Sequence, residues 1–336
     1  MGRLVLACLI GPALVLSTGC ATVPVAVDGP LERGPKVLLE WADKKSSPAG
    51  GNGEKPDAAV NGSGAGTDTT ASNRVDEEPD VIVTDRPDFT EASSTVGRGR
   101  VQLEAGYTFT RDRTNGERFS SHSYPEALLR VGMFADWFEF RLGQNFGTER
   151  TTLPDGTRTT GSGADDLYLG VKLGLTEQKA WRPEVALVLQ MTVPSGSRDF
   201  SAREVLPGIN LLYGWDVIKD RVSVGGSTQA NRVRGDFALP DFMGLEQAVT
   251  GRHSYLLLAQ SLTVNYTLTE KLGAYTEWFA FFPDSAIGPE VGPEHYLDGG
   301  FTYKVTPAFQ LDIRAGVGLN RHAADFFAGS GFAVKY

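Results

Sequence analysis

The last five residues, Phe332-Ala333-Val334-Lys335-Tyr336, place large apolar side chains at every second position and close on an aromatic residue. Because successive side chains of a β-strand point to opposite faces, such a segment has one apolar face and one that can be polar. The same alternation recurs along the chain from Val101 onward. A closed ring of such strands suits a membrane, since closure pairs every backbone N–H and C=O group where no water is available. The pattern therefore predicts an all-β fold, a single antiparallel transmembrane β-barrel.

About twelve segments are predicted as strands, each close to the roughly 9–11 residues that a tilted strand needs to cross a membrane. They are residues 99–110, 123–133, 137–147, 165–175, 183–193, 207–215, 221–230, 254–266, 272–282, 294–304, 308–318 and 328–336. Long connections, such as 111–122, 148–164 and 231–253, alternate with short ones. Outer-membrane barrels have long outer loops and short periplasmic turns. This order predicts a barrel over residues 99–336 in an outer membrane of the Gram-negative type, with both barrel ends on the periplasmic side.

Aromatic residues near the ends of the predicted strands indicate two membrane interfaces. Trp137, Trp181 and Trp215 lie beside the short connections. A second group lies near the long connections and consists of Tyr107, Tyr124, Phe146, Tyr255, Phe282 and Tyr296. Trp and Tyr favour such interfaces because their rings are apolar and carry one polar group.

The N-terminal part of the chain is unlike the predicted barrel. Residues 1–20 are typical of an export signal, with Arg3, an apolar core and small residues before Cys20. Cys20 is a candidate for lipidation, and ordinary cleavage nearby is the alternative. Residues 21–79 are rich in Gly, Ala, Ser, Asp and Pro. We expect a disordered, flexible periplasmic linker here, because this composition buries too little apolar area to offset the chain entropy.

Charged side chains on the polar strand faces are predicted to line the barrel lumen. These residues are Glu104, Glu126, Arg130, Glu139, Arg141, Lys172, Asp312 and Arg314, with the uncharged Gln190, Asn210 and Gln260. Charges of both signs either bridge one another in a filled lumen or line a wet pathway. Mixed signs argue against a strongly ion-selective pore.

Residues 80–98 (DVIVTDRPDFTEASSTVGR) lead directly into the first predicted strand from the periplasmic side. Their composition resembles neither the linker nor a strand, and two interpretations follow. The segment is a solvated approach to the barrel, or it folds inward and occludes the lumen. In the second case Asp85, Arg86, Asp88 and Phe89 are the candidate plug residues.

No constellation for catalysis or metal binding stands out. The adjacent pairs His122-Ser123 and His253-Ser254 superficially suit a barrel hydrolase, but nucleophilic catalysis also requires a third group that orients the base. The pair Asp165-Asp166 is expected at a solvated strand edge, because adjacent strand carboxylates point to opposite faces and form a poor Ca²⁺ cage. We therefore expect no enzyme, no cofactor and no metal site. The net charge of −9 argues against a nucleic-acid partner.

Two parts of the chain resemble the sequences of a known family. The beginning of the resemblance lies in residues 84–91 (TDRPDFTE) and 102–107 (QLEAGY). Its C-terminal part lies in residues 310–312 (QLD), 316–320 (GVGLN) and 324–327 (ADFF). The family comprises transporters grouped as the MetA-pathway of phenol degradation, and the resemblance spans roughly residues 80–336. It implies an outer-membrane channel.

Taken with the residue patterns, the resemblance predicts passive passage of small solutes, hydrophobic or aromatic ones among them, with membrane lipids and lipopolysaccharide as partners. A structural or adhesive barrel with a filled lumen is the alternative, and a barrel hydrolase is the third.

Overall fold

A computed structural model describes residues 81–239, 249–286 and 291–336 of the chain. The predicted signal peptide, the predicted linker and Cys20 lie outside the described residues. Within them there are thirteen strands: β1 (Val101–Thr114), β2 (Glu117–Gly132), β3 (Phe138–Thr152), β4 (Arg158–Ala164), β5 (Leu167–Thr176), β6 (Glu184–Val193), β7 (Leu206–Ile218), β8 (Val222–Leu239), β9 (Val249–Thr267), β10 (Leu272–Asp284), β11 (Glu294–Thr306), β12 (Phe309–Gly318) and β13 (Phe326–Lys335). None of the described segments is a helix with the length and apolarity to cross a membrane.

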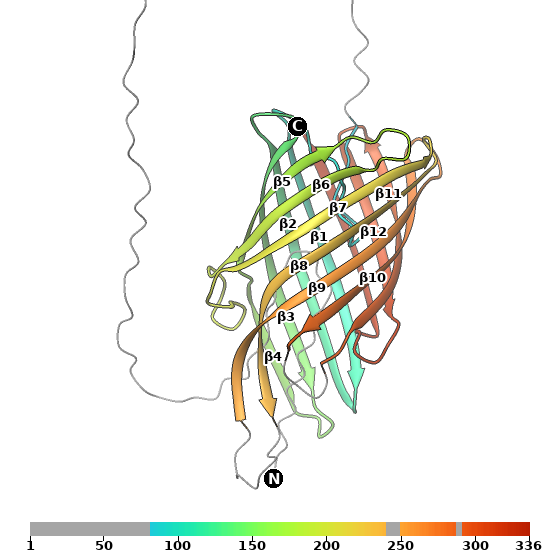
Figure 1. The fold of residues 1–336 in the computed structure, drawn as a ribbon. Helices are drawn as coiled ribbons and strands as arrows, with labels where there is room; N and C mark the ends of the chain where they lie inside the picture. The colour runs from blue at the N-terminus through green and yellow to red at the C-terminus, as the bar shows by residue number, and fades with distance from the viewer. Residues whose placement is uncertain (1–80, 240–248, 287–290) are drawn as a thin grey trace, which may run out of the picture. The chain divides into compact units, whose positions relative to one another are not determined.

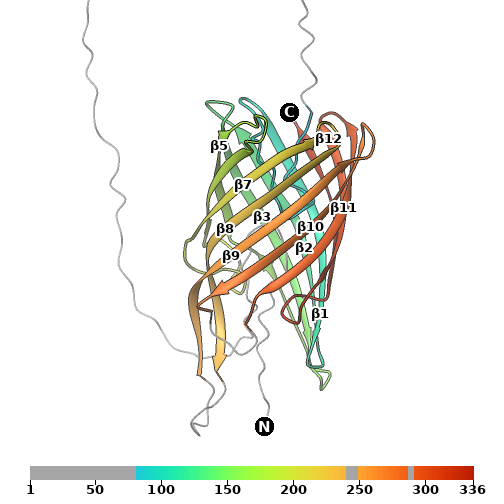
Figure 2. The same ribbon diagram turned by 45° about the vertical axis from the view of Figure 1, so that its right-hand side comes forward.

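The strands form one closed antiparallel barrel (Figures 1 and 2). Each strand pairs with its neighbour in the chain, except that β4 pairs with β3 alone and β3 also pairs with β5. The first and last strands close the ring, with Gln102 opposite Lys335 and Arg111 opposite Phe326. The result is a barrel of twelve strands with β4 as an extra strand on its rim, and the predicted fold is confirmed.

The two faces of the wall are reversed relative to a soluble barrel. In β12, Gln310, Asp312 and Arg314 are buried in the interior, whereas Leu311 and Ile313 are exposed on the outside, Ile313 by 56%. An exterior of apolar side chains matches a hydrocarbon solvent, and the strand ladders satisfy the backbone internally. The period-two alternation of the sequence therefore sets which side chains face lipid.

Several strands run further than predicted at the end opposite the short turns. β1 continues to Thr114 and β2 starts at Glu117, joined by Asn115 and Gly116, both with positive φ as two-residue hairpin turns require. The predicted loop 148–164 contains the end of β3 and all of β4, and β8 and β9 project beyond the rim (Figure 1). The loop assignments were wrong here because these extensions carry polar side chains on both faces at many positions, as at Arg111, Asp112 and Arg113, which interrupts the apolar alternation.

The aromatic residues largely follow the expected interfaces. Trp137 and Trp181 are exposed beside the short turns, and the Trp215 indole N–H donates to the Trp181 carbonyl oxygen at 2.9 Å. Tyr107 and Tyr124 are exposed toward the other end. The assignments of Tyr296 and Tyr255 were wrong, because the Tyr296 ring is fully buried inside the barrel and Tyr255 packs against the same interior cluster. An aromatic residue near a strand end fits either face, and the strand register alone decides between them.

Candidate functional site

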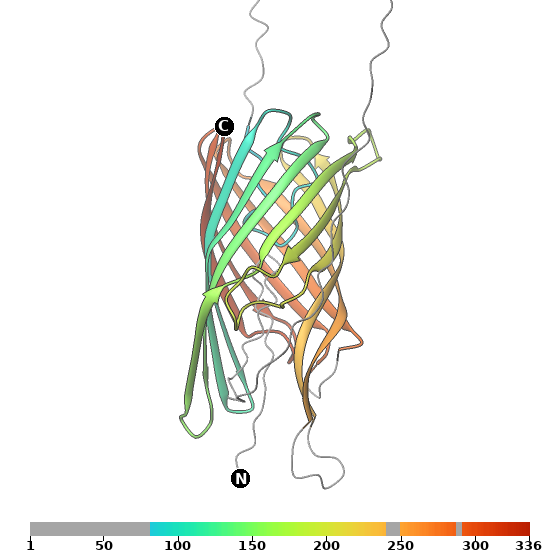
Figure 3. The same ribbon diagram turned by 90° about the vertical axis from the view of Figure 1, so that its left-hand side faces the viewer.

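Residues 81–98, called the inner segment from here on, lie inside the barrel, in the half nearer the C-terminus (Figure 3). Both of its ends are fixed at the short turns. The Ile82 N–H donates to the Pro307 carbonyl oxygen at 2.8 Å, Thr95 Oγ1 donates to the backbone oxygen of Asp136, and the Arg98 N–H donates to the Asp136 carboxylate at 3.0 Å. The inner segment therefore enters and leaves by the same end of the barrel.

Asp85 is the centre of its attachment. Its carboxylate lies 2.5 Å from Arg141 Nη2, 3.0 Å from Lys172 Nζ and 3.3 Å from Arg130 Nη1. All four side chains are buried. Burial alone would raise the pKa of Asp85, but the positive charges of Arg130, Lys172 and Arg141 outweigh it and hold the pKa below its ordinary value. Asp85 is thus a carboxylate that joins strands β2, β3 and β5 to the inner segment.

Two wall carboxylates hold the inner segment through its backbone. Glu104 accepts hydrogen bonds from the Asp85 N–H at 3.1 Å and from the Arg86 N–H at 3.0 Å. Glu139 accepts one from the Val96 N–H at 2.9 Å and is also bound in bidentate fashion by Arg130, at 2.8 and 2.9 Å. Charge-assisted bonds of this kind are shorter and stronger than neutral ones. Because these bonds are made to backbone N–H groups, they fix the path of the inner segment's backbone as well as the positions of its side chains.

Arg86 forms a second attachment, to strands β2 and β12 of the wall. Its guanidinium lies 2.8 Å from Glu126 and 3.4 Å from Asp312. A Cβ at Gly106 or Gly331 would overlap this guanidinium, so both strands need glycine where Arg86 approaches the wall. Burial opposes the charge of Arg86, but Glu126 and Asp312 raise its pKa above the ordinary value. The pair Asp85-Arg86 therefore binds groups of opposite charge on one continuous arc of the wall, from β12 through β2 to β5.

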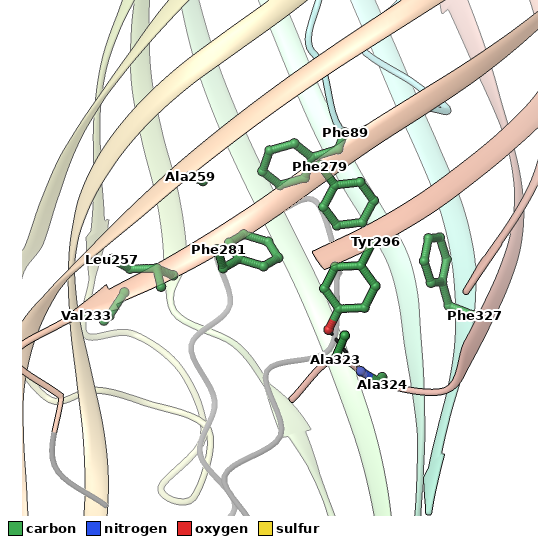
Figure 4. Packing of buried hydrophobic residues seen from close by; sticks show 10 residues of the cluster. All are labelled: Phe89, Val233, Leu257, Ala259, Phe279, Phe281, Tyr296, Ala323, Ala324 and Phe327. Atoms are coloured by element: carbon green, nitrogen blue, oxygen red, sulfur yellow. Dashed lines mark hydrogen bonds between the residues drawn. The ribbon is translucent and has the colours of Figure 1, made fainter. Parts of the chain in front are cut away.

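The tip of the inner segment contacts an aromatic cluster on the wall. Phe89 and Thr90 donate their N–H groups to Glu277 at 2.6 and 2.7 Å. The Phe89 ring stacks on Phe279 with centroids 4.8 Å apart, and Phe279 stacks in turn on Tyr296 at 4.8 Å (Figure 4). The cluster comprises Phe89, Val233, Leu257, Ala259, Phe279, Phe281, Tyr296, Ala323, Ala324 and Phe327. It is an apolar surface that lies inside the barrel beside the charged network around Asp85 and Arg86.

Asp88, beside this tip, faces carboxylates instead of cations. Burial and then the negative charge of Asp298 raise the pKa of Asp88 well above its ordinary value, and Asp85 adds to the shift. Glu277 of β10 is the third carboxylate of this group, and Asp298 also interacts electrostatically with Arg314 of β12. The inner segment is therefore docked most favourably when Asp88 carries a proton.

This arrangement predicts that docking weakens as the pH rises. A carboxyl whose pKa is raised in the docked state contributes stability that is complete below its ordinary pKa of 3.8 and is lost as the pH rises through the raised value. We expect the apparent Tm of the folded protein to fall and its ion conductance to rise over that range. Asp88→Asn should make both quantities less dependent on pH. An unchanged pH profile in Asp88→Asn would contradict this assignment.

The eight charged residues predicted for the lumen all contact the inner segment. Beyond those described above, Arg130 donates to the Val83 and Ser94 carbonyl oxygens, Lys172 to the Ala92 oxygen, and Arg314 to the Pro87 oxygen. The four candidate plug residues, Asp85, Arg86, Asp88 and Phe89, are also buried there. The strands thus bring the two predicted groups of residues together in one network.

Other residues differ from expectation. Gln190 and Asn210 are buried, but Gln260 belongs to the outer face, where it bonds Thr228 and the Tyr213 hydroxyl. Sequence reasoning also missed Glu277 and Asp298. A signal was present, because a carboxylate in the middle of a spanning strand is costly toward lipid and must face inward. The aromatic residues around Glu277 concealed which face that was.

The candidate hydrolase and metal residues have structural partners. Ser123 bonds Asn145 at 3.1 Å and Ser254 bonds Glu204 at 2.6 Å, while the His122 ring bonds the Tyr107 hydroxyl on the other face of the wall. The expectation of a solvated edge for Asp165-Asp166 was wrong. Both residues are buried, and Asp166 accepts the N–H groups of Gly196 and Ala202, which fixes the loop between β6 and β7.

Comparison with solved structures gives membrane β-barrels. An outer membrane channel from Pseudomonas putida F1 is 13% identical, with a TM-score of 0.56 over 73% of this chain and 98% of that one. The NanC porin is 10% identical, with a TM-score of 0.42 over 70% and 100% of the two chains. The translocator domain of the autotransporter NalP from Neisseria meningitidis is 12% identical, with a TM-score of 0.45 over 70% and 88%. A comparison with curated protein sequences gives no match.

Comparison with family sequence profiles agrees with the motifs at both ends of the barrel. The profile described as the MetA-pathway of phenol degradation matches residues 84–336, which begins inside the inner segment and includes every strand. The matched region therefore contains both parts of the site, the wall charges and the tip that carries Phe89. The chain belongs to the family of the MetA-pathway of phenol degradation.

Proposed function

We propose that this protein is an outer-membrane channel for the passive passage of small molecules, closed at rest by the inner segment. The observation that carries the proposal is the way the lumen is filled. The occluding residues form one continuous stretch that joins the wall through side chains, as at Asp85 and Arg86, and that contributes no strand to the barrel ladder. The stretch can leave the lumen without breaking a strand pairing.

This geometry favours a channel over a structural barrel with a filled lumen. A barrel filled by its own wall side chains stays closed whatever its N-terminal part does. Here the wall cations Arg130, Arg141 and Lys172 take much of their neutralising charge from Asp85 and Glu91 of the inner segment. Withdrawal of the inner segment would leave a polar, hydrated wall. Catalysis is not part of the proposal, because the candidate serines are engaged with Asn145 and Glu204.

The proposal also includes the predictions made for residues 1–79. Residues 1–20 would direct export, residues 21–79 would act as a periplasmic tether, and Cys20 would be the lipidation site if the signal is of the lipoprotein type. With both ends of the inner segment at the short turns, the tether would reach the lumen from the periplasmic side. A pull on the tether would then act directly on the inner segment.

The solutes we propose are small aromatic or apolar molecules. The family is described by phenol degradation, and the aromatic cluster offers ring faces where Phe89 now packs. Once the inner segment leaves, Phe279 loses its stacking partner and an aromatic solute can take the place of Phe89. Passage would follow the concentration gradient, and no energy source or cofactor is required.

Solute block of the ion current tests this proposal. In a variant that lacks residues 81–95, phenol should reduce the single-channel current, and Phe279→Ala in that background should weaken the block about 3- to 10-fold, the usual range for losing one aromatic pair. Phe301→Ala is the matched control, because Phe301 is 50% exposed on the outer face. Equal block in the Phe279 and Phe301 variants would exclude the aromatic cluster as a solute site.

A further inference from the structure

The outer face of the barrel carries a compact group of arginines at the rim opposite the short turns. The arginine patch, as we call it, consists of Arg111 and Arg113 on β1, Arg118 on β2, Arg150 on β3 and Arg158 on β4, all exposed. The strand register places them side by side. Arg113 is directly opposite Arg118, and Arg111 and Arg150 flank Ser120 from the two neighbouring strands.

These side chains belong to the outer face because their neighbours along the strands point inward. Asp112, between Arg111 and Arg113, is buried in the interior, and Phe119, next to Arg118, is buried as well. Glu149, next to Arg150, pairs with Ser121 on the inner side of the same ladder. The carboxylates of Asp112 and Glu149 therefore lie on the opposite face of the wall from the arginines beside them.

The arginine patch is not neutralised within the described part of the chain. No ion pair there involves any of its members, whereas the buried arginines Arg86, Arg130 and Arg141 of the lumen have carboxylate partners. Like charges directly opposite each other on neighbouring strands are destabilising, as for Arg113 and Arg118. An anion bound between them would remove this cost.

The depth of the arginine patch is given by the aromatic side chains below it. Phe109 and His122 are directly opposite each other one step nearer the barrel centre, with ring centroids 5.2 Å apart, and the Tyr124–Phe146 pair follows at 5.3 Å. Aromatic bands of this kind lie at the level of the lipid headgroups. A step of two residues along a strand is roughly 7 Å, so the arginines lie just outside this level, where the phosphates of an outer leaflet are.

We infer that the arginine patch binds the phosphate groups of lipopolysaccharide in the outer leaflet. The inference rests on the outer-membrane placement in the proposed function. Guanidinium groups suit this ligand because their forked N–H groups bind phosphate oxygens in bidentate fashion. Several arginines spread over four strands match a glycolipid with more than one phosphate, and the aromatic band below provides a surface for its acyl chains.

Binding of lipopolysaccharide to the purified full-length protein in neutral detergent tests the inference. The triple variant Arg113→Gln, Arg118→Gln, Arg150→Gln should bind about tenfold more weakly than the wild type or worse, since each exposed arginine adds modestly to binding of an anionic lipid surface. The matched control is Lys219→Gln, Arg221→Gln, Lys271→Gln, which removes the same charge from exposed positions at the short turns. The control should bind like the wild type.

Two further arms identify the ligand and separate this inference from the channel. Lipopolysaccharide with its lipid A phosphates removed should bind wild type and triple variant equally and weakly, and phosphatidylglycerol should not substitute for the intact glycolipid. The triple variant should show wild-type conductance, so a conducting protein whose lipopolysaccharide affinity is unchanged by the three substitutions overturns the inference alone. A folded variant lacking residues 81–95 that never conducts would instead count against the proposed function.

Discussion

In an Asp85→Ala variant we expect the inner segment to detach and the channel to open far more often than in the wild type. The substitution leaves Arg130, Arg141 and Lys172 buried with one carboxylate fewer among them. Removing one partner from a buried ion pair typically costs about 3–5 kcal/mol, because the remaining charge stays desolvated and uncompensated. A loss of that size shifts the docked-to-undocked ratio by a factor of about 100 or more. Single-channel recording in a planar bilayer measures the open fraction directly.

The control for this experiment is Asp155→Ala. Asp155 lies exposed in the turn between β3 and β4, and its carboxylate accepts the N–H of Thr157 within that turn. This variant should conduct like the wild type. Heat-modifiable gel mobility verifies that each barrel is folded before recording. A folded Asp85→Ala barrel with the open fraction of the wild type would show that Asp85 does not hold the inner segment in place.

A Gly132→Ala variant should also displace the inner segment, by a steric route instead of an electrostatic one. A Cβ at Gly132 would overlap the backbone carbonyl of Gly97. The two segments of the backbone are held together there, because the Gly99 N–H donates to the Gly132 oxygen at 2.9 Å. Backbone atoms have no rotamer with which to move aside. We expect a cost at the upper end of the about 1–3 kcal/mol seen for overpacking, and an increase in open fraction.

Gly174→Ala is the matched control for Gly132→Ala. An added Cβ at Gly174 meets Trp137 at 3.5 Å, an ordinary van der Waals distance, at the same end of the barrel. Limited proteolysis of the inner segment provides the second readout, because a displaced segment is cleaved while the barrel strands are protected. Equal cleavage of the Gly132 and Gly174 variants would mean that the contact with Gly97 does not determine docking.

The fold could be predicted from the sequence because the lipid solvent imposes a strict rule on every spanning strand. Alternation in stretches such as Phe309–Gly318 locates the strand and assigns its faces at once. The rule ends where the strands leave the membrane, since polar side chains are then allowed on both faces. The β1–β2 hairpin at Asn115 and Gly116 and the short strand β4 lie in that region, and both were assigned to loops.

The sequence predicts which charged residues of the wall belong to the site, but it does not predict which of them contact one another. Charged residues such as Arg141 and Asp312 can be assigned to the interior from the alternation of side chains along the strand alone, because the other face of the strand is in contact with lipid. Which charges meet depends on the path of the inner segment through the lumen, and no periodicity encodes that path. The aromatic stack of Phe89, Phe279 and Tyr296 was missed for the same reason, since it joins the inner segment to β10 and β11.

The most direct test of the account is the single-channel conductance of the wild type beside that of the variant lacking residues 81–95. This deletion removes Asp85, Arg86 and Phe89 and leaves every strand of the barrel intact. We predict that the wild type is mostly closed and that the deletion variant shows discrete, larger and longer open steps in the same bilayer. A folded deletion variant with the conductance of the wild type, or with none, would contradict the proposal that the inner segment closes a channel.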